Sequence, residues 1–146
     1  MIRPARRDDV ETVIAAYEWL FAPPGVRPPA WDEAAAAQRL RRLIASDDGE
    51  MLVAEHDGAI VGICSVVLDI ESVRFGRRAW VEDLAVHPDH RSAGHGKALL
   101  DAAKDWGRRH GATHLELDSG EARADAHRFY NREQPAYRSV QFGWEL

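Results

Sequence analysis

A buried strand that runs into a glycine-containing turn and then a helix constrains this chain more than any other feature. Val81–Val86 has the apolar, β-branched composition of a strand, and Pro88 ends it because its ring removes a ladder donor. Gly94 and Gly96 follow, and apolar residues then recur at helical spacing to about His110. Two glycines let the backbone turn tightly and let a ligand approach. The first helical amides are unpaired at the positive end of the helix dipole, so the pattern predicts an anion site.

Single positions in this turn exclude the two common nucleotide-binding loops. A P-loop needs a glycine where Arg91 stands and a hydroxyl residue where Ala98 stands. The dinucleotide-binding fingerprint needs a third glycine, which the run Gly94–Leu99 lacks. Either the phosphate ligand belongs to another class, or the turn is only the entry to a helix.

The other elements predict an α/β domain with a mixed sheet and about four helices, a single domain over residues 1–146. His56-Asp57-Gly58 predicts a hairpin, and the strand–helix–strand unit around the glycine turn predicts two parallel strands. Asp8 or Asp9 is expected to cap the first helix and Asp32 the second. Expected strands are Ile2–Ala5, Met51–Glu55, Ala59–Leu68, Trp80–Val86, Thr113–Asp118 and the end of Tyr137–Leu146; expected helices run from Asp9 to Leu20, Asp32 to Ala45, Gly94 to His110 and Ala122 to Glu133; Arg74–Arg78 is expected to be a turn.

Composition narrows the partners and the compartment. The net charge is −5, and no run of Lys and Arg suggests a nucleic-acid partner. No apolar stretch approaches a membrane span, and the N-terminus lacks a signal-peptide core, so we expect a cytoplasmic protein. Cys64 is the single cysteine and is expected to be a buried hydrophobe. We expect no metal site, because His87, His90, His95 and His127 do not have metal-ligand spacing.

The run Arg91-x-x-Gly94-x-Gly96, after the strand and a His-Pro-Asp sequence, resembles the acetyl-CoA motif of the GNAT superfamily of N-acetyltransferases. Ile2–Ala5, Ala59–Gly62 and Ala126–Tyr130 resemble that family's opening, third strand and late helix, so the resemblance covers nearly the whole chain. It implies a central mixed sheet that splays between two parallel strands. It also implies transfer of the acetyl group of acetyl-CoA to a primary amine by direct attack in a ternary complex.

The resemblance also implies which residues hold acetyl-CoA. Backbone groups of Leu84, Ala85 and Val86 would pair with the pantetheine arm as a pseudo-strand. Arg91 would position the loop that cradles the pyrophosphate. Arg123 stands where many relatives have Asn, and it either contacts a CoA phosphate or caps the helix region. The cradle amides would be those of Ser92, Ala93, Gly94, His95, Gly96 and Lys97.

Acetyl transfer needs a neutral amine, so a general base is expected. Glu82 is the predicted base, because a carboxylate in an otherwise buried strand is costly without a purpose. Family members resembling polyamine acetyltransferases carry Glu-Asp at this place. A salt bridge from Glu82 to Arg77 or Arg78 is the alternative. Asp83 is expected to point to the opposite face of the sheet.

Tyr130 is the predicted general acid, because the resemblance puts a tyrosine hydroxyl near the thioester sulfur; a packing role is the alternative. Relatives usually end the following turn with a glycine–aromatic pair, whereas this chain has Gln134 and Pro135 there. We expect Pro135 to end the helix. The tail is short for two closing strands, so completion of the sheet by a second copy, a homodimer, is one expectation.

The acceptor amine is not specified by these motifs. The resemblance implies that the loops Phe21–Trp31 and Asp69–Arg78 build the acceptor site. The same fold could act on a protein N-terminus or an aminoglycoside instead of a small amine. A non-catalytic acyl-CoA-binding regulatory domain is the alternative from another class.

Overall fold

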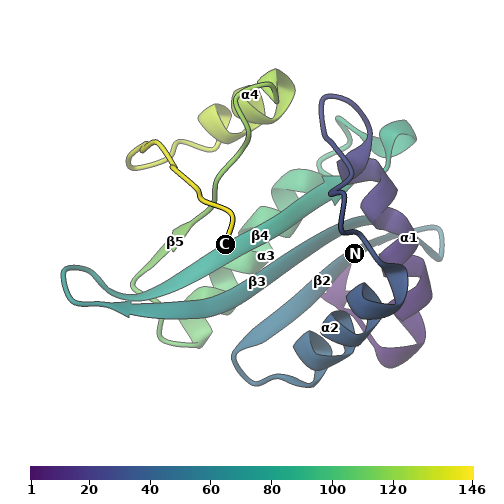
Figure 1. Cartoon of the computed structure of the whole chain (residues 1–146), viewed down its shortest axis with the longest axis horizontal. Coiled ribbons are helices and arrows are strands. Elements are labelled where there is room, and N and C mark those ends of the chain that lie inside the picture. Colours follow the sequence, from purple (N-terminus) through teal and green to yellow (C-terminus); the bar gives the residue numbers. More distant parts are fainter.

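The protein, described over all 146 residues as a computed structural model, forms one five-stranded sheet with strand order β1-β2-β3-β4-β5. The first four strands pair antiparallel and β5 lies parallel to β4, as predicted. Figure 1 shows α1 and α2 on one side of the sheet, α3 on the other, and α4 standing apart beside the C-terminal tail. The strands are β1 (Ile2–Pro4), β2 (Gly49–His56), β3 (Ala59–Ser72), β4 (Gly76–Val86) and β5 (His114–Glu116); the helices are α1 (Val10–Phe21), α2 (Glu33–Ala45), α3 (His95–Arg109) and α4 (Ala124–Arg132).

Two hydrophobic layers fix the helices to the sheet. On one face, apolar residues of α1 and α2 such as Val13 and Leu40 pack with Val53 and Ile63 of the strands. On the other face, Leu99, Ala103 and Trp106 of α3 pack with strand residues that include the fully buried Cys64. Cys64 is therefore the buried hydrophobe that was expected. Burial raises the pKa of its thiol to about 12, so the thiolate is disfavoured.

The two predicted helix caps have different outcomes. Asp32 caps α2, since its carboxylate accepts a hydrogen bond from the Ala35 amide at 3.1 Å. Asp9 does not cap α1 through its side chain. Its carboxylate instead pairs with Arg3 at 2.7 Å and accepts from the Arg6 amide, within a one-turn 3₁₀ helix, Arg7–Asp9, that precedes α1. The ion pair to a neighbouring strand outcompetes the local cap.

The hairpin between β3 and β4 is longer than expected. Gly76–Arg78 belong to β4 rather than to a turn, because Ser72 pairs with Gly76 and Glu71 with Arg77 across the ladder. Arg78 also reaches both neighbours of β4, with Asp69 on β3 at 2.6 Å and Glu116 on β5 at 3.1 Å. Cross-strand charge pairs thus extend a segment whose polar sequence predicted a turn.

The tail does not form the strand that was predicted. Residues 133–146 have no regular secondary structure, and Val140, Phe142, Trp144 and Leu146 are exposed. β5 is only three residues long, so its outer edge offers few backbone groups for a further strand. The helix before the tail also ends earlier than Pro135: α4 stops at Arg132, and Gln134 takes the left-handed conformation, with φ of 56°, in which glycine commonly ends a helix.

β4 and β5 are paired over only three residues each. Arg78, Ala79 and Trp80 face His114, Leu115 and Glu116, and the ladder stops there. Beyond Trp80 the two parallel strands diverge, which is the predicted splay. The edge of β4 from Val81 to Val86 therefore keeps backbone groups that no strand of this chain pairs on that side. None of the helices is long and apolar enough to span a lipid bilayer.

Candidate active site

The turn between β4 and α3 presents unpaired amides at the start of a fifteen-residue helix. Gly94 is the N-cap and has a φ of 87°, a conformation that disfavours side chains. No side chain caps the helix, and the first helical bond runs from the Ala98 amide to the Gly94 carbonyl. The amides of His95, Gly96 and Lys97 therefore have no helical partner. This end of α3 fits the phosphates of an anionic ligand.

The neighbours of this turn define its shape and charge. A Cβ on Gly96 would lie 3.6 Å from the ring of Phe129, so α4 covers this part of the turn closely. Arg91 donates from Nε to the Val86 carbonyl at 3.3 Å and so ties the turn to the end of β4. The ammonium of Lys97 pairs with Asp101 at 2.7 Å and Glu133 at 3.4 Å. Arg91 is thus placed to hold the loop, while Lys97 is already engaged by carboxylates.

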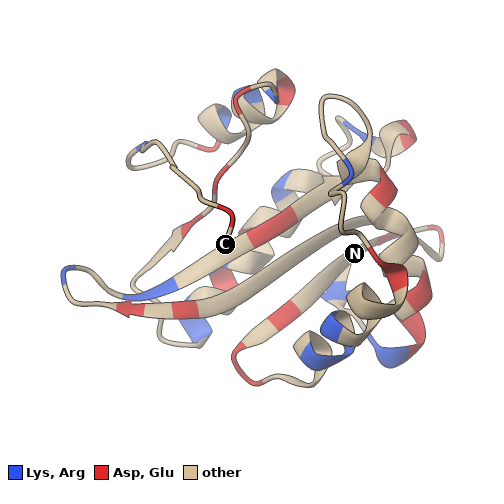
Figure 2. Cartoon of the chain, in the orientation of Figure 1, with Lys and Arg blue, Asp and Glu red and all other residues tan.

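A β-bulge places Glu82 and Asp83 on the same side of β4. Cys64 faces Leu84 and Val66 faces Val81, so the two acidic residues together oppose Ser65. The Asp83 amide donates to the Ser65 hydroxyl at 3.0 Å and so gives the bulge a partner. The prediction that Asp83 points to the opposite face is wrong, because a bulge breaks the strict alternation of side chains. In Figure 2 this acidic pair marks the middle of β4.

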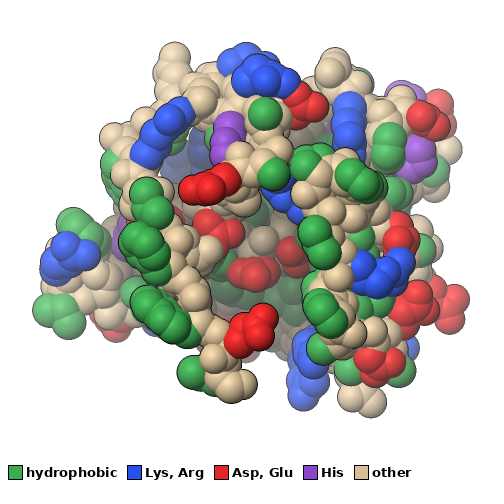
Figure 3. Space-filling view, turned by 45° about the horizontal axis from the view of Figure 1, so that its top comes forward, with side chains coloured by type: hydrophobic (Ala, Val, Ile, Leu, Met, Phe, Trp, Pro, Cys, Tyr) green, Lys and Arg blue, Asp and Glu red, His purple; other side chains and the backbone are tan.

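Both carboxylates and the predicted acid line one cavity of about 200 Å³, which we call the catalytic cavity. It lies between β4, the segment after β5, and α4. Figure 3 shows the hollow of this face, with acidic side chains on its floor and hydrophobic ones along its walls. The lining residues are Leu20, Val81, Glu82, Asp83, Leu84, Leu117, Asp118, Ser119, Gly120, Arg123, Ala126 and Tyr130.

Glu82, Asp83 and Tyr130 differ in environment although they line the same cavity. Glu82 is exposed and accepts a hydrogen bond from the Trp80 indole at 2.6 Å, rather than pairing with Arg77 or Arg78. Burial raises the pKa of the Asp83 carboxyl, although the hydrogen bond from the Tyr17 hydroxyl at 2.7 Å opposes this. Burial raises the pKa of the Tyr130 hydroxyl to about 12, so it stays protonated at neutral pH.

The comparison with known proteins identifies the family. The model of the acetyltransferase (GNAT) family matches residues 13–134, which is more than half of the chain. The chain belongs to the GNAT acetyltransferase family. This confirms the resemblance on which the assignment of acetyl-CoA as co-substrate depends.

Two curated GNAT relatives and one solved structure illustrate the similarity. YhdJ of Bacillus subtilis, an uncharacterized N-acetyltransferase, is 37% identical over 93 residues, covering 64% of this chain and 65% of its own. Streptothricin acetyltransferase of Streptomyces lavendulae is 31% identical over 87 residues, covering 60% of this chain and 44% of its own. The match thus spans less than two thirds of either relative. The aminoglycoside N-acetyltransferase AAC(6')-Iy, solved in complex with CoA, superposes with a TM-score of 0.84 at 17% identity, covering 99% of this chain and 93% of that one.

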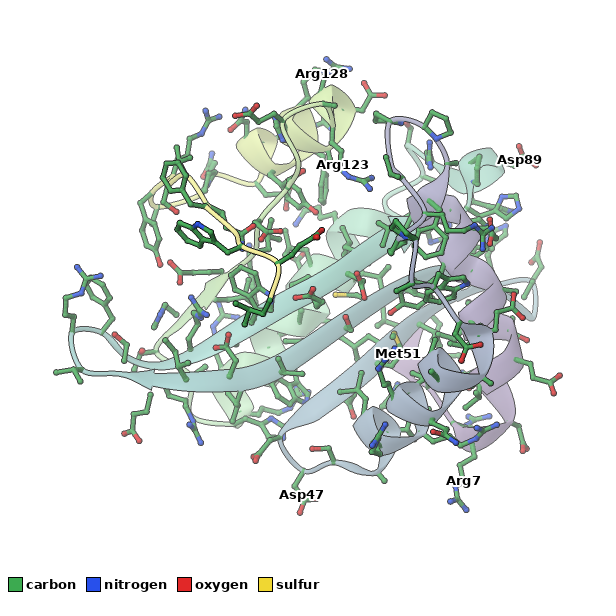
Figure 4. All side chains as sticks on the ribbon, in the orientation of Figure 1. Arg7, Asp47, Met51, Asp89, Arg123 and Arg128 are labelled. Carbon is green, nitrogen blue, oxygen red and sulfur yellow. The ribbon has the colours of Figure 1, made fainter.

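Arg123 of this GNAT chain bridges the two sides of the hollow. Its guanidinium donates to the Leu20 carbonyl at the end of α1, at 3.0 Å, from a residue that lies just before α4. Figure 4 shows the labelled side chain directed from the α4 side toward the chain that follows α1. This contact is neither of the two alternatives predicted for Arg123, because it is made to the end of α1 and the side chain makes no cap hydrogen bond to α4. A role toward a CoA phosphate stays a prediction.

Sequence reasoning missed a group of histidines beside the turn. His56, His90 and His95 have ring centroids 5.4 to 6.2 Å apart, and His87 lies 5.4 Å from His90. His56 is 31 or more positions away from the others in sequence, so no local pattern could reveal this cluster. Burial, followed by the charges of the neighbouring imidazoles, lowers the pKa of His95. No group of histidine, cysteine or acidic residues has the arrangement needed to hold a metal ion.

The two predicted acceptor loops separate in space. Phe21, Val26, Pro28 and Trp31 line a cavity next to the catalytic one, whereas no residue of Asp69–Arg78 lines either cavity. The hairpin that contains Asp69–Arg78 extends away from the hollow (Figure 1). The β3–β4 hairpin is longer than its sequence predicted, and this length carries Asp69–Arg78 away from the cavities.

Asp83→Asn is expected to stabilise the protein at pH 7 to 8 by about 2–4 °C in Tm. Burial raises the pKa of Asp83 in the folded protein above its value in the unfolded chain. The contribution of Asp83 to the stability of the folded state is therefore most favourable below the usual carboxyl pKa and is lost as the pH rises through the raised value. An amide keeps an acceptor for Tyr17 but carries no charge. Thermal melts from pH 3 to 8 should show the gain disappearing at the acid end. Asp47→Asn, at an exposed surface position (Figure 4), is the control; a gain that is independent of pH would contradict this interpretation.

Proposed function

We propose that this protein transfers the acetyl group of acetyl-CoA to a primary amine by direct attack within a ternary complex. The observation that carries the proposal is that Glu82, Asp83 and Tyr130, from two distant elements, line one cavity beside the unpaired edge of β4. The family assignment supplies the co-substrate, whose thioester provides an activated acetyl group.

The residues that hold acetyl-CoA are proposed from the backbone geometry. The free edge of β4 at Leu84, Ala85 and Val86 suits an extended arm carrying amides, such as pantetheine, because these residues pair with β3 on one side and with no strand on the side of β5. The amides from Ser92 to Lys97 at the start of α3 suit the pyrophosphate. Arg91 holds that loop through the Val86 carbonyl. The two sites adjoin, since the turn continues directly from the strand.

Glu82 is proposed as the general base, acting through a water molecule. An alkylammonium has a pKa near 10.4, so roughly one amine in a few thousand is neutral at pH 7. A carboxylate that takes up the proton lets the amine nitrogen form the new C–N bond. Glu82 is exposed enough to exchange that proton with solvent, and Asp83 beside it helps attract the cationic acceptor. Asp83 is the competing candidate for the base.

Tyr130 is proposed as the acid that serves the departing sulfur. As the C–S bond breaks, the hydroxyl donates a hydrogen bond to the thiolate, and the sulfur leaves as the thiol of CoA. A thiol has an ordinary pKa near 8.5. Complete transfer from a hydroxyl with a pKa of about 12 is therefore uphill, so the hydrogen bond is the larger part of its contribution. From the ammonium form, nitrogen loses two protons: one passes through Glu82 to solvent before the attack, and the other, lost as the C–N bond forms, balances the proton gained by sulfur.

A thiol-release assay tests this proposal. Purified protein is mixed with acetyl-CoA and a panel of primary amines that includes alkylamines, arylalkylamines, polyamines, aminoglycosides, amino acids and a peptide with a free N-terminus. Amine-dependent release of CoA, with the acetylated amine identified by mass spectrometry, is the expected result. Binding of CoA without turnover on any amine would favour the non-catalytic regulatory alternative. The streptothricin and aminoglycoside acetyltransferases among the similar proteins make those antibiotics useful members of the panel.

A further inference from the structure

A second cavity of about 230 Å³, which we call the aromatic cavity, adjoins the catalytic cavity. The two share Leu20, Asp83 and Arg123, so a ligand that enters one meets the other. The aromatic cavity lies between α1, the loop that precedes α2, and the bulge of β4. Its lining residues are Tyr17, Leu20, Phe21, Val26, Pro28, Trp31, Asp83 and Arg123.

Three mutually packed rings form the wall of this cavity. Tyr17 stacks on Trp31 with ring centroids 5.6 Å apart, and Phe21 meets the edge of Trp31 at 4.8 Å. Tyr17 and Phe21, one helical turn apart, are 6.2 Å from each other. Rings held by one another have little freedom to rearrange, so the wall is preformed. Flat apolar walls of this kind favour a planar apolar group.

The charges at the base of the aromatic cavity already have partners. The Asp83 carboxylate accepts a hydrogen bond from the Tyr17 hydroxyl, and the Arg123 guanidinium donates to the Leu20 carbonyl. One negative and one positive side chain thus meet here, and the rest of the lining carries no charge. Asp83 is the single carboxylate of this lining and is shared with the catalytic cavity, so a second ammonium group here would compete for it with the reacting amine and would lie near Arg123. The carboxylates Glu82 and Asp118 belong to the catalytic cavity alone.

One polar atom in this wall lacks a partner. Nε1 of Trp31 is buried and makes no hydrogen bond within the chain. Buried donors are nearly always satisfied in folded proteins, and an exception calls for an explanation. Because that atom has almost no accessible surface, a ligand in the aromatic cavity would contact it only if the Trp31 ring moved.

We infer that the acceptor is an arylalkylamine: a primary amine on a short arm that ends in a planar ring, with the ring in the aromatic cavity and the amine in the catalytic cavity. This inference rests on the proposed acetyl transfer. An apolar cavity of roughly 150 Å³ accommodates benzene, so the aromatic cavity has room for one ring and part of its arm. A linked set of polar sugar rings does not match that size or that lining.

The inference is tested by comparing amine acceptors that carry a planar ring with amines that do not. Values of kcat/KM are measured for 2-phenylethylamine, tyramine, n-propylamine, spermidine and kanamycin. The arylalkylamines are expected to exceed n-propylamine by at least about tenfold, because apolar groups of this size change kcat/KM by such factors. Spermidine or kanamycin exceeding both arylalkylamines would overturn the inference and leave the proposed transfer intact. No CoA release with any amine would overturn the proposed transfer.

Binding without turnover gives a separate readout of the ring site. Isothermal titration calorimetry of 2-phenylethylamine and kanamycin into the protein, with and without CoA, compares their affinities directly. Tighter binding of 2-phenylethylamine supports the inference even where chemistry is slow. Tighter binding of kanamycin contradicts it.

Val26→Glu supplies the matched variant. Val26 lines the aromatic cavity but is 78% exposed, so a glutamate there leaves the core intact. The variant is expected to lower kcat/KM for 2-phenylethylamine at least about fivefold, by placing a charge where the ring binds, and to leave spermidine unchanged or improved. Val73→Glu, at a fully exposed site on the β3–β4 hairpin, is expected to change neither. Equal effects of the two variants on 2-phenylethylamine would overturn the inference.

Discussion

Tyr130→Phe is expected to lower kcat for acetyl transfer by about 10²-fold while leaving the affinity for CoA nearly unchanged. The hydroxyl is the only part removed, and a single hydrogen-bond donor aimed at developing negative charge typically contributes a factor of this order. The ring still packs beside Phe129, where the centroids lie 5.2 Å apart, so α4 should keep its position. Steady-state kinetics with saturating acetyl-CoA, together with calorimetric binding of CoA, would measure both quantities.

The control for Tyr130 is a second tyrosine of the same chain. Tyr137 lies in the exposed tail, lines neither cavity and loses the same hydroxyl on substitution by phenylalanine. Tyr137→Phe should therefore have wild-type kcat. If Tyr130→Phe has the wild-type Tm and an unchanged kcat, Tyr130 has only a packing role and is not the acid.

Glu82→Gln is expected to lower kcat/KM by about 10²-fold near pH 7 and by much less near pH 10. General-base assistance typically contributes 10²–10⁴-fold. Its benefit is greatest where the amine is protonated and shrinks as the solution itself deprotonates the amine near its pKa of about 10.4. The measurement is a pH–rate profile from pH 6 to 10 for the wild type and the variant, with one amine at fixed concentration.

Two further variants, measured beside Glu82→Gln, show whether Glu82 is the general base. Glu71→Gln changes an exposed carboxylate at the far end of β3 and should leave the profile unaltered. Asp83→Asn tests the competing carboxylate of the bulge. If Asp83→Asn shows the loss confined to low pH and Glu82→Gln shows a uniform loss, the base is Asp83 and the proposed role of Glu82 is wrong.

The parts of the fold that follow local rules could be predicted from the sequence. The glycine turn and the Asp32 cap each depend on neighbouring residues, the parallel pairing of β4 with β5 follows from the strand–helix–strand order, and all three appear as expected. The buried thiol of Cys64 follows from an apolar run. These features need only residue type and spacing, which a single sequence contains.

The features that were missed depend on residues far apart in the chain. The bulge at Glu82 and Asp83 needs Ser65 as a partner on β3, so alternation along β4 alone gave the wrong face for Asp83. The contact of Arg123 with Leu20 spans 103 positions. The tail alternates apolar and polar residues like a strand, yet a strand also needs an edge to pair with, and β5 is short. A sequence pattern indicates which structure a segment favours, but it does not show whether a partner lies beside that segment in the fold.

The predicted site residues are also far apart in the sequence. Glu82 and Tyr130 come together in one cavity although 48 positions separate them in the sequence. Their proximity was expected only from the family resemblance. Another departure is Gln134, which takes the left-handed conformation in which glycine commonly ends a helix. The chain after Tyr130 therefore takes the left-handed turn at a residue that the sequence pattern did not favour there.

The divergence of β4 from β5 after three residue pairs has a consequence for how freely this chain can vary. A ligand arm recognised along the open edge is read by main-chain amides and carbonyls, which every residue except proline supplies alike. Replacement of Leu84 or Val86 by another residue that keeps the strand extended would leave those groups in place. The co-substrate site proposed along this edge would thus tolerate sequence changes that would abolish a site made of side chains, and selectivity for the acceptor could change around it.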